Sequence, residues 1–138
     1  MNPIKVRDYM VRQPVTFTPE MSLTAALEKV INSEHLGGPV LDTKGAVVGF
    51  ISEQDLLEKL IKVSYDCQDT YLVGDCMHKE VLSVSPELGI IELAEMMKVG
   101  KPKVYPVIEE GKLLGIITRR DVLQAIEKNI QTCFKHPV

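Results

Sequence analysis

One motif occurs twice in this chain of 138 residues, and the duplication limits the folds that the chain can adopt. Each copy begins with a glycine and continues as an apolar run of strand length that contains a second glycine. A hydroxyl residue, two variable positions, an aspartate and an apolar helical pattern follow. The copies span residues 45–57 and 111–123. Further segments match at an offset of 67: 6–10 with 73–77, 16–21 with 83–88, and 39–42 with 106–109. One residue is lost in the turn that follows, so the two copies of the motif match at an offset of 66. Two homologous halves therefore make up nearly the whole chain.

The first half predicts the order strand, helix, strand, strand, helix. Residues 14–18 read as a short strand, and Ser22 is a plausible N-cap for a helix whose apolar positions extend from Leu23 to Ile31. Residues 39–41 and 46–51 read as a hairpin around a turn at 42–45. The second helix starts at Ser52, and its expected apolar face comprises Leu56, Leu57, Leu60 and Ile61.

The second half repeats this order. The expected strands are 82–84, 103–108 and 112–117, and the first helix has its apolar face at Ile90, Ile91, Leu93, Ala94 and Met97. Val122, Leu123 and Ile126 are expected to face inward from the last helix. We predict an α+β fold of two tandem β-α-β-β-α repeats. Repeat 1 spans 1–62, a polar connector spans 63–72, and repeat 2 with a short C-terminal tail spans 73–138.

Composition and charge argue against several classes of protein. The net charge is −3 and neither half is basic, so binding to nucleic acid is unlikely. The three cysteines have no zinc-type or CxxC spacing, which favours free thiols in a reducing cytosol. No signal peptide and no apolar run of about 20 residues is evident, so we expect a soluble, cytoplasmic protein without membrane contact.

Catalytic chemistry also finds no support in the sequence. His35, His78 and His136 are scattered, with no second ligand at helical spacing, and no nucleotide-binding glycine loop or nucleophile motif is present. We therefore expect neither a metal site nor an enzyme.

The hydroxyl-x-x-Asp spacing allows two interpretations. Ser52 or Thr118 could cap a helix while Asp55 or Asp121 at the third helical position bonds back to the cap, which requires no ligand. Alternatively, the amides at the helix start could bind phosphate while the aspartate holds ribose hydroxyls. The residues alone leave both open.

The repeated pattern resembles the CBS domain, the cystathionine-β-synthase repeat that occurs in tandem pairs called Bateman modules. Two segments of each half carry the resemblance, which covers about residues 3 to 130: 39–42 with 49–55, and 106–109 with 115–121. The resemblance implies two sheets packed face to face about a pseudo-twofold axis. Since no other domain is evident, we expect a stand-alone regulatory pair.

The resemblance also implies two clefts that hold adenine nucleotides or other adenosyl compounds. Each cleft would combine the hydroxyl-x-x-Asp turn of one repeat with the first strand and the residues before Pro-Val of the other. One would use Thr118, Arg120 and Asp121 with Val15, Thr16, Leu36 and Gly37. The other would use Ser52 and Asp55 with Leu82, Ser83, Lys103 and Val104. Asp121 and Asp55 would take the ribose hydroxyls, with the hydroxyl residue and the helix start facing the phosphates.

The two clefts differ in charge. Arg119 and Arg120 stand at one helix start, whereas Glu53 and Gln54 stand at the other, where we expect Lys103 to offset Glu53 in part. Bonds from arginine to phosphate are about twice as strong as neutral ones, which makes the Thr118 cleft the better phosphate site. The alternative is that both arginines belong to a solvated face. Tyr105, just before Pro106, could either fill the core or line a cleft.

We therefore expect a regulatory module without catalysis or a covalent cofactor, which senses AMP, ADP, ATP or S-adenosylmethionine and acts on an unknown protein target. The alternative is a structural dimerisation or adaptor module without a ligand. A homodimer is expected in either case, because we expect one small module to leave two apolar helix faces with little cover: Leu27, Val30 and Ile31, and Leu93, Ala94 and Met97.

Overall fold

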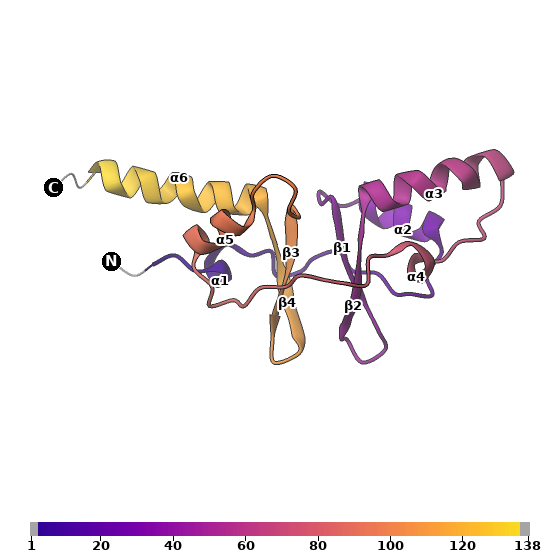
Figure 1. Ribbon diagram of the computed structural model, residues 1–138, viewed down its shortest axis with the longest axis horizontal. Helices are drawn as coiled ribbons and strands as arrows, with labels where there is room; N and C mark the ends of the chain where they lie inside the picture. Colours follow the sequence, from indigo (N-terminus) through magenta and orange to yellow (C-terminus); the bar gives the residue numbers. More distant parts are fainter. Residues whose placement is uncertain (1–2, 136–138) are drawn as a thin grey trace.

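The computed structural model describes residues 3–135 and places two β-hairpins side by side at the centre, with helices at both outer ends (Figure 1). The extreme ends of the two predicted repeats, residues 1–2 and 136–138 with His136, lie outside the described part. The helices are α1 (Val6–Tyr9), α2 (Leu23–Ile31), α3 (Glu53–Asp66), α4 (Val73–Cys76), α5 (Ile90–Met96) and α6 (Arg119–Lys135). The strands are β1 (Gly37–Leu41), β2 (Val47–Ser52), β3 (Val104–Glu109) and β4 (Lys112–Thr118).

The two hairpins are built alike and face each other. Strand β1 pairs with β2 and β3 with β4, both antiparallel, and each hairpin has a register shift at the same place, after Val40 and after Val107. Five residues separate the paired Leu41 and Val47, whereas four separate the equivalent pair Ile108 and Leu113, which explains the change of offset. Strands β1 and β3 contact each other across the middle of the molecule. The predicted α+β fold with facing sheets is confirmed.

The predicted first strand of each repeat shrinks to a single bridged residue. Phe17 forms a parallel bridge to Val40, and Val84 forms the equivalent bridge to Val107. Phe17 donates its amide to the Pro39 carbonyl at 3.1 Å and accepts from the Leu41 amide at 2.8 Å. A proline follows each bridged residue by two positions, Pro19 and Pro86, and it limits the pairing because a proline has no amide hydrogen to donate to the ladder.

Each repeat instead opens with a one-turn helix that the sequence analysis did not assign. In α1 the Asp8 carboxylate accepts a hydrogen bond from the Lys5 amide at 3.0 Å, and in α4 Asp75 accepts from the Leu72 amide at 3.0 Å. This local cap explains why an aspartate recurs at the same place in both repeats.

These one-turn helices cross over to the other half of the molecule. Val6 of α1 is fully buried in the core of the second hairpin, whereas Val73 of α4 is fully buried in the core of the first. The backbone follows the same exchange, since the Val6 amide donates to Leu88 at 2.8 Å and the Val73 amide donates to Met21 at 2.8 Å. Figure 1 shows α1 beside α5, and α4 beside α2 and α3. Each packed half thus contains residues of both sequence repeats.

Two glycines of the duplicated motif make room for the crossing segments. A Cβ atom on Gly115 would lie 2.1 Å from the Val11 carbonyl oxygen, and one on Gly49 would lie 2.4 Å from the Met77 sulfur. The segments are this close because Val11 bridges to Ile116 and His78 bridges to Phe50. Both glycines are therefore required by a close approach of backbones.

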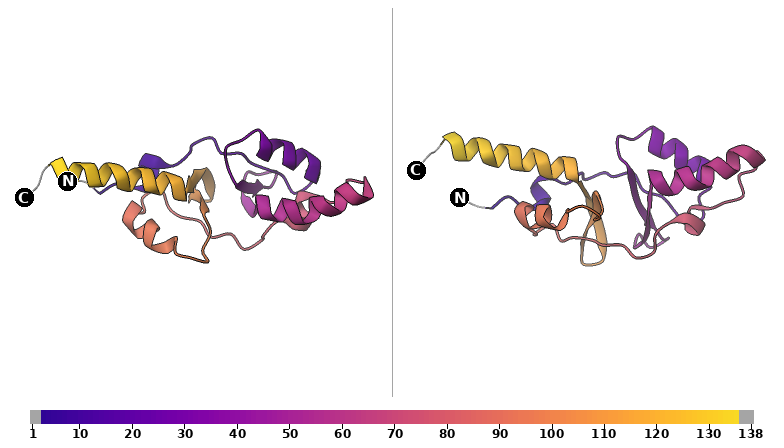
Figure 2. Two further views of the ribbon diagram at one scale, coloured as in Figure 1. Left: turned by 90° about the horizontal axis from the view of Figure 1, so that it is seen from above. Right: turned by 45° about the horizontal axis from the view of Figure 1, so that its top comes forward.

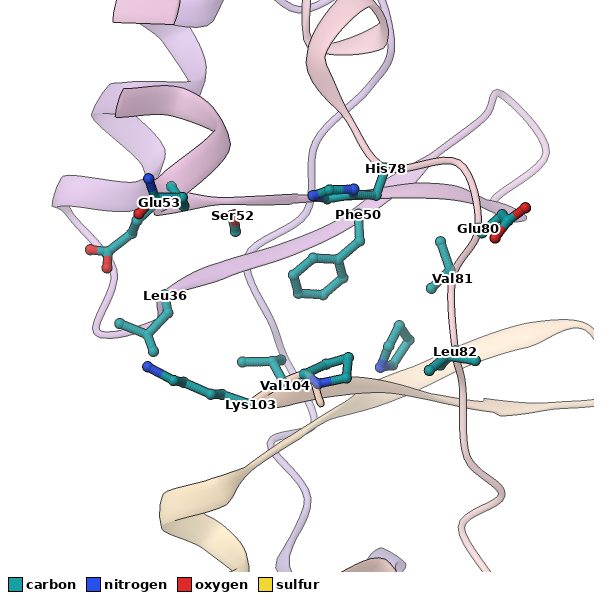
Figure 3. A pocket seen from close by; sticks show the side chains of 13 residues that line it. Leu36, Phe50, Ser52, Glu53, His78, Glu80, Val81, Leu82, Lys103 and Val104 are labelled. Carbon is teal, nitrogen blue, oxygen red and sulfur yellow. The ribbon is translucent and has the colours of Figure 1, made fainter. Parts of the chain in front are cut away.

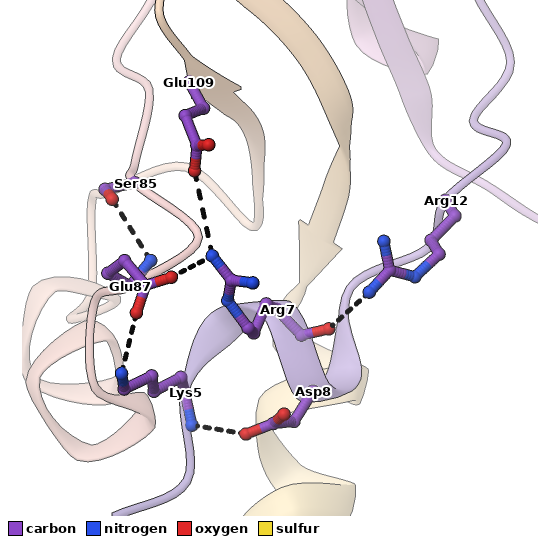
Figure 4. A network of polar contacts seen from close by, with 7 residues as sticks. All are labelled: Lys5, Arg7, Asp8, Arg12, Ser85, Glu87 and Glu109. Atoms are coloured by element: carbon purple, nitrogen blue, oxygen red, sulfur yellow. Dashed lines mark hydrogen bonds and ion pairs between the residues drawn. The ribbon is translucent and has the colours of Figure 1, made fainter.

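Polar contacts fasten the N-terminal crossing segment to the second half (Figure 4). Glu87 accepts from the Lys5 ammonium at 2.7 Å and also pairs with the Arg7 guanidinium, which lies 3.8 Å from Glu109. Arg12 donates to the Arg7 carbonyl at 3.3 Å. The four side chains that form the ion pairs are roughly half exposed, so we assign most of the cohesion to the buried Val6 rather than to the ion pairs.

The helices agree with the prediction in position but not in every face. Ser22 caps α2 by accepting from the Ala25 amide at 3.2 Å, as expected. Helix α3 runs to Asp66, so the first four residues of the predicted connector 63–72 are helical, and the helix stops at Cys67 in the left-handed conformation. Tyr105 fills the core and does not line a cleft.

Four residues predicted on the apolar helix faces are exposed, and three predicted to lack cover are buried. Leu57, Ile61 and Leu123 are more than half exposed, because the short sheets and helices α2 and α5 cover only a narrow stripe of α3 and α6. Ile91 of α5 is also more than half exposed. Val30, Leu93 and Met97 are less than a tenth exposed, because the crossing helices and hairpins already cover them. The expectation of a homodimer from these two apolar faces was therefore partly wrong, because three of their six residues are buried.

Candidate functional site

A cavity of about 520 Å³ lies between the two hairpins, on the side where β2 turns into α3 (Figure 3). Its walls come from both halves: the end of β2 with the start of α3, the segment that follows α4, and the start of β3. The lining residues are Leu36, Phe50, Ser52, Glu53, Gln54, His78, Glu80, Val81, Leu82, Pro102, Lys103, Val104 and Pro106.

The start of α3 fixes Ser52 at this wall. Ser52 accepts from the Asp55 amide at 3.3 Å, and one oxygen of the Asp55 carboxylate accepts from both the amide and the hydroxyl of Ser52 at 2.9 Å each. The amide of Glu53, the first helical residue, donates to the Leu36 carbonyl at 2.8 Å. The capping interpretation of the motif is thus realised, and two of the first three amides of α3 are already engaged.

The other helix start is built in the same way. Thr118 accepts from the Asp121 amide at 3.1 Å, and Asp121 accepts from the amide and hydroxyl of Thr118 at 2.9 Å each. The Arg119 amide donates to the Lys103 carbonyl at 2.9 Å. The duplicated motif therefore has a structural role in both repeats, whatever else it does.

His78 distinguishes the cavity from the equivalent place in the other repeat. It exchanges both backbone bonds with Phe50 at 2.9 Å, which holds it on the wall, and its Nε2 lies 2.9 Å from the second oxygen of Asp55. At the repeat offset, its counterpart is Val11, which cannot form such a pair. Asp55 is therefore bound to protein groups through both carboxylate oxygens.

The structure brings together four residues of the predicted Ser52 cleft, and they come from different repeats: Ser52, Leu82, Lys103 and Val104. The other two predicted residues, Asp55 and Ser83, do not line the cavity. Asp55 is bonded to the lining residue Ser52, and Ser83 follows the lining residue Leu82 in the chain. Leu36 was assigned to the Thr118 cleft, but it lines the Ser52 cavity, because the chain before β1 turns back over the start of α3.

The residues predicted for the Thr118 cleft have local contacts. Gly37 is the strand partner of Ser52, the Thr16 carbonyl accepts from the Lys29 ammonium, and Val15 lies against Gly38. Arg120 is exposed beside the capped Thr118 and Asp121. Their use as a second ligand site remains a prediction.

Sequence reasoning missed several lining residues. Phe50 lies two positions before Ser52 in the same strand, so the period of a strand could have placed its side chain on the same face. Val81 and Glu80 precede the predicted Leu82 directly. His78 had no usable signal, because its approach to Asp55 depends on the crossing of α4.

The cavity is apolar inside and charged at its rim. Its apolar lining includes Phe50, Val81, Leu82 and Val104, and the Phe50 ring points into the cavity (Figure 3). Glu53 and Lys103 lie at one end and Glu80 lies at the other, all three exposed to solvent. Such a space suits a flat apolar group with polar substituents reaching the rim.

Neither a metal site nor a membrane-spanning helix is found in the described part of the chain. Between residues 3 and 135, no three His, Cys, Asp or Glu side chains are grouped so that they could hold a metal ion. Over the same range, no helix combines the length and apolar character needed to cross a membrane.

Comparisons with known proteins agree on one family. The CBS domain profile matches residues 6–62 and 73–128. AcuB from Vibrio cholerae has a solved structure that is 27% identical, covers 99% of this chain and 100% of its own, and superimposes with a TM-score of 0.83. The structure of CBSX2 from Arabidopsis thaliana in complex with AMP is 30% identical, covers 90% of this chain and 96% of its own, and has a TM-score of 0.78.

Curated relatives include much longer proteins. The A-adding tRNA nucleotidyltransferase of Aquifex aeolicus is 30% identical over 128 residues, which are 93% of this chain and 15% of that enzyme. The chain spans less than half the length of each of the first curated relatives that it matches.

Proposed function

The chain belongs to the CBS domain family as a tandem pair, and from that premise we propose that it is a regulatory module that binds an adenosine-containing ligand in the Ser52 cavity. The cavity itself carries this proposal. Its volume of about 520 Å³ lies within the range of about 300–1,000 Å³ that is usual for small-molecule sites. The AMP complex of CBSX2, a relative of similar length, supports a ligand of this class.

The lining suggests how such a ligand would bind. An adenine ring would lie against Phe50 and between Leu36 and Leu82, all of which present apolar surface to the cavity. The hydroxyl of Ser52 and the ammonium of Lys103 would meet polar groups of the sugar or its substituent. Thr118, Arg120 and Asp121, with Val15, Thr16 and Gly37, would form a second site.

The module would act through binding rather than catalysis, on a protein target in the cytoplasm. A ligand held between two halves that share crossing segments stabilises their relative arrangement, and a partner could sense that arrangement. AMP, ADP, ATP and S-adenosylmethionine are the candidate ligands.

A thermal-shift screen with these four compounds and NAD tests the proposal. A ligand present at 100 times its dissociation constant should add about 2.7 kcal/mol to the free energy of unfolding. Leu82→Trp should fill the cavity and abolish the shift, whereas Val99→Trp, at a fully exposed position, should preserve it. If no compound shifts the melting temperature, ligand sensing is refuted. A shift that survives in Leu82→Trp would move the site elsewhere.

A homodimer is supported by apolar side chains that are exposed on the outer helices. The same surface would serve a dimerisation or adaptor role. Several apolar side chains on the outer helices are at least four-tenths exposed: Ile31, Leu57, Ile61 and Tyr65 at one end, and Ile91, Leu123, Ile130 and Phe134 at the other. Helices α3 and α6 lie on the same side of the molecule, where a second copy could cover both (Figures 1 and 2).

Sedimentation equilibrium distinguishes a monomer from a homodimer. A single species of 15.4 kDa at micromolar concentration would contradict the dimer. Leu57→Glu and Leu123→Glu, which occupy equivalent positions in the two repeats, should show which helix lies in the interface.

A further inference from the structure

We propose that the Ser52 cavity selects adenosyl ligands without phosphate, namely nucleosides and their neutral or cationic derivatives, over nucleotides. This inference rests on the proposed function, because it assigns the ligand class of the same cavity. Two observations carry it, the engaged helix amides and the charges at the rim, and the equivalent helix start, which has the same capping bonds, shows that the charges are what differs between the repeats.

The start of α3 offers few free donors to a phosphate, because two of its first three amides are in use. The amide of Glu53 is bonded to Leu36 and that of Asp55 to Ser52, so neither points freely into the cavity. The Asp55 carboxylate also sits at the positive end of the helix dipole and balances it. A phosphate would have to displace these internal bonds.

The rim of the cavity carries more negative than positive charge. Two of the lining residues are carboxylates, Glu53 and Glu80, and Lys103 is the single lysine or arginine among them. The remaining candidate cation, His78, already faces Asp55 at 2.9 Å. Since Glu53 and Glu80 lie at opposite ends (Figure 3), a phosphate is close to a carboxylate in either orientation of the ligand.

The equivalent helix start in the other repeat shows the opposite arrangement. Arg119 and Arg120 occupy the places of Glu53 and Gln54, and Val11 occupies the place of His78. The local backbone and the capping bonds are the same in both repeats, so the difference lies in the side chains. The duplicated scaffold thus offers a cavity that disfavours anions on one side and a cationic helix start on the other.

A tryptophan reporter reads the cavity separately from the second helix start. The chain contains no tryptophan, so Phe50→Trp places a single indole in the cavity wall. We expect 5′-methylthioadenosine and adenosine to change its fluorescence at concentrations about fivefold or more below those needed for AMP, at low ionic strength. Because the rim charges are exposed, physiological salt should reduce the difference in affinity between AMP and the two ligands without phosphate.

Charge-neutral variants of this reporter protein provide the matched control. Glu53→Gln should strengthen AMP binding about two- to fivefold and leave adenosine unchanged, since one repulsive charge at the rim is removed. Arg119→Gln, at the equivalent position of the other repeat, should change neither affinity at the reporter.

The possible results separate the inference from the proposed function. AMP binding at the reporter as tightly as adenosine, with no effect of Glu53→Gln, overturns the selection against phosphate and leaves an adenosyl-binding module. No response to any adenosyl compound, in Phe50→Trp or in a second folded reporter with Val81→Trp, overturns both. Calorimetry on the wild-type chain checks that the reporters preserve the order of affinities.

Discussion

Replacing Val6 with alanine should destabilise the second half of the molecule, although Val6 belongs to the first sequence repeat. Its side chain is fully buried among the residues of α5, α6 and the second hairpin. The equivalent residue at the repeat offset, Val73, is also fully buried, but in the core of the first hairpin. Each of these two valines therefore belongs to the core of the half that the other sequence repeat mainly forms.

The magnitude follows from the atoms removed. Valine to alanine deletes two carbons from a closed core, and each buried methylene contributes about 0.8 kcal/mol. The cavity left behind adds to this loss, because the surrounding core relaxes only in part. We expect Val6→Ala to lower the free energy of unfolding by about 2–3 kcal/mol, and Val73→Ala to lower it by a similar amount.

Native-state amide hydrogen exchange can locate the loss. Under conditions where exchange occurs from partly open states, Val6→Ala should reduce protection mainly in α5, β3, β4 and α6. Val73→Ala should reduce it mainly in α2, β1, β2 and α3. Urea denaturation of both variants gives the total change in stability.

The reasoning fails if Val6→Ala reduces protection chiefly in α2, β1, β2 and α3, since the repeats would then pack as they follow in sequence. Equal losses in both halves for both variants would show that the molecule opens as one unit, and would refute the assignment of each crossing helix to one core. A loss of stability below about 0.5 kcal/mol would contradict the burial of Val6.

Three further predictions concern the site and the crossing segments. Asp121→Ala should weaken nucleotide binding more than Asp55→Ala, because Asp55 is already paired with His78, and calorimetric titration showing the reverse order would reject this. Gly115→Ala should cost about 1–3 kcal/mol in urea denaturation, because its Cβ would meet the Val11 carbonyl, whereas Gly89→Ala, which meets a flexible glutamate side chain at 3.2 Å, should cost less than about 1 kcal/mol. Burial raises the pKa of the Cys76 thiol above its ordinary value of 9.0, so less thiolate is present at pH 8 and iodoacetamide should modify Cys76 more slowly than the exposed Cys67 and Cys133. Its rate should still be rising above pH 9, and equal rates by mass spectrometry would contradict the burial.

Elements that depend on neighbouring residues could be predicted from the sequence. Ser52 and Thr118 each bond to an aspartate three residues on, so the spacing of hydroxyl and acidic residues located two helix starts. Ser22 before an apolar helical pattern located a third. The hairpins followed from their short turns, and the duplication established that both halves share one architecture. The grouping of Ser52 with Leu82, Lys103 and Val104 came from the family resemblance.

Tertiary structure decided which repeat supplies which wall. The sequence shows α1 and α4 as repeated motifs, but the choice of core for each depends on long-range contacts, about 80 residues apart for α1, such as Lys5 with Glu87, and about 50 apart for α4, such as Val73 with Met21. The crossing of α4 also puts His78 beside Asp55. Leu57 and Leu123, which local periodicity had placed inside, are exposed because too little packs against α3 and α6 to cover them. Periodicity reports that a helix has an apolar side, whereas the width of that side is set by what packs against it. Long-range packing therefore fixed the composition of each core and of the cavity, which no local pattern in the sequence encodes.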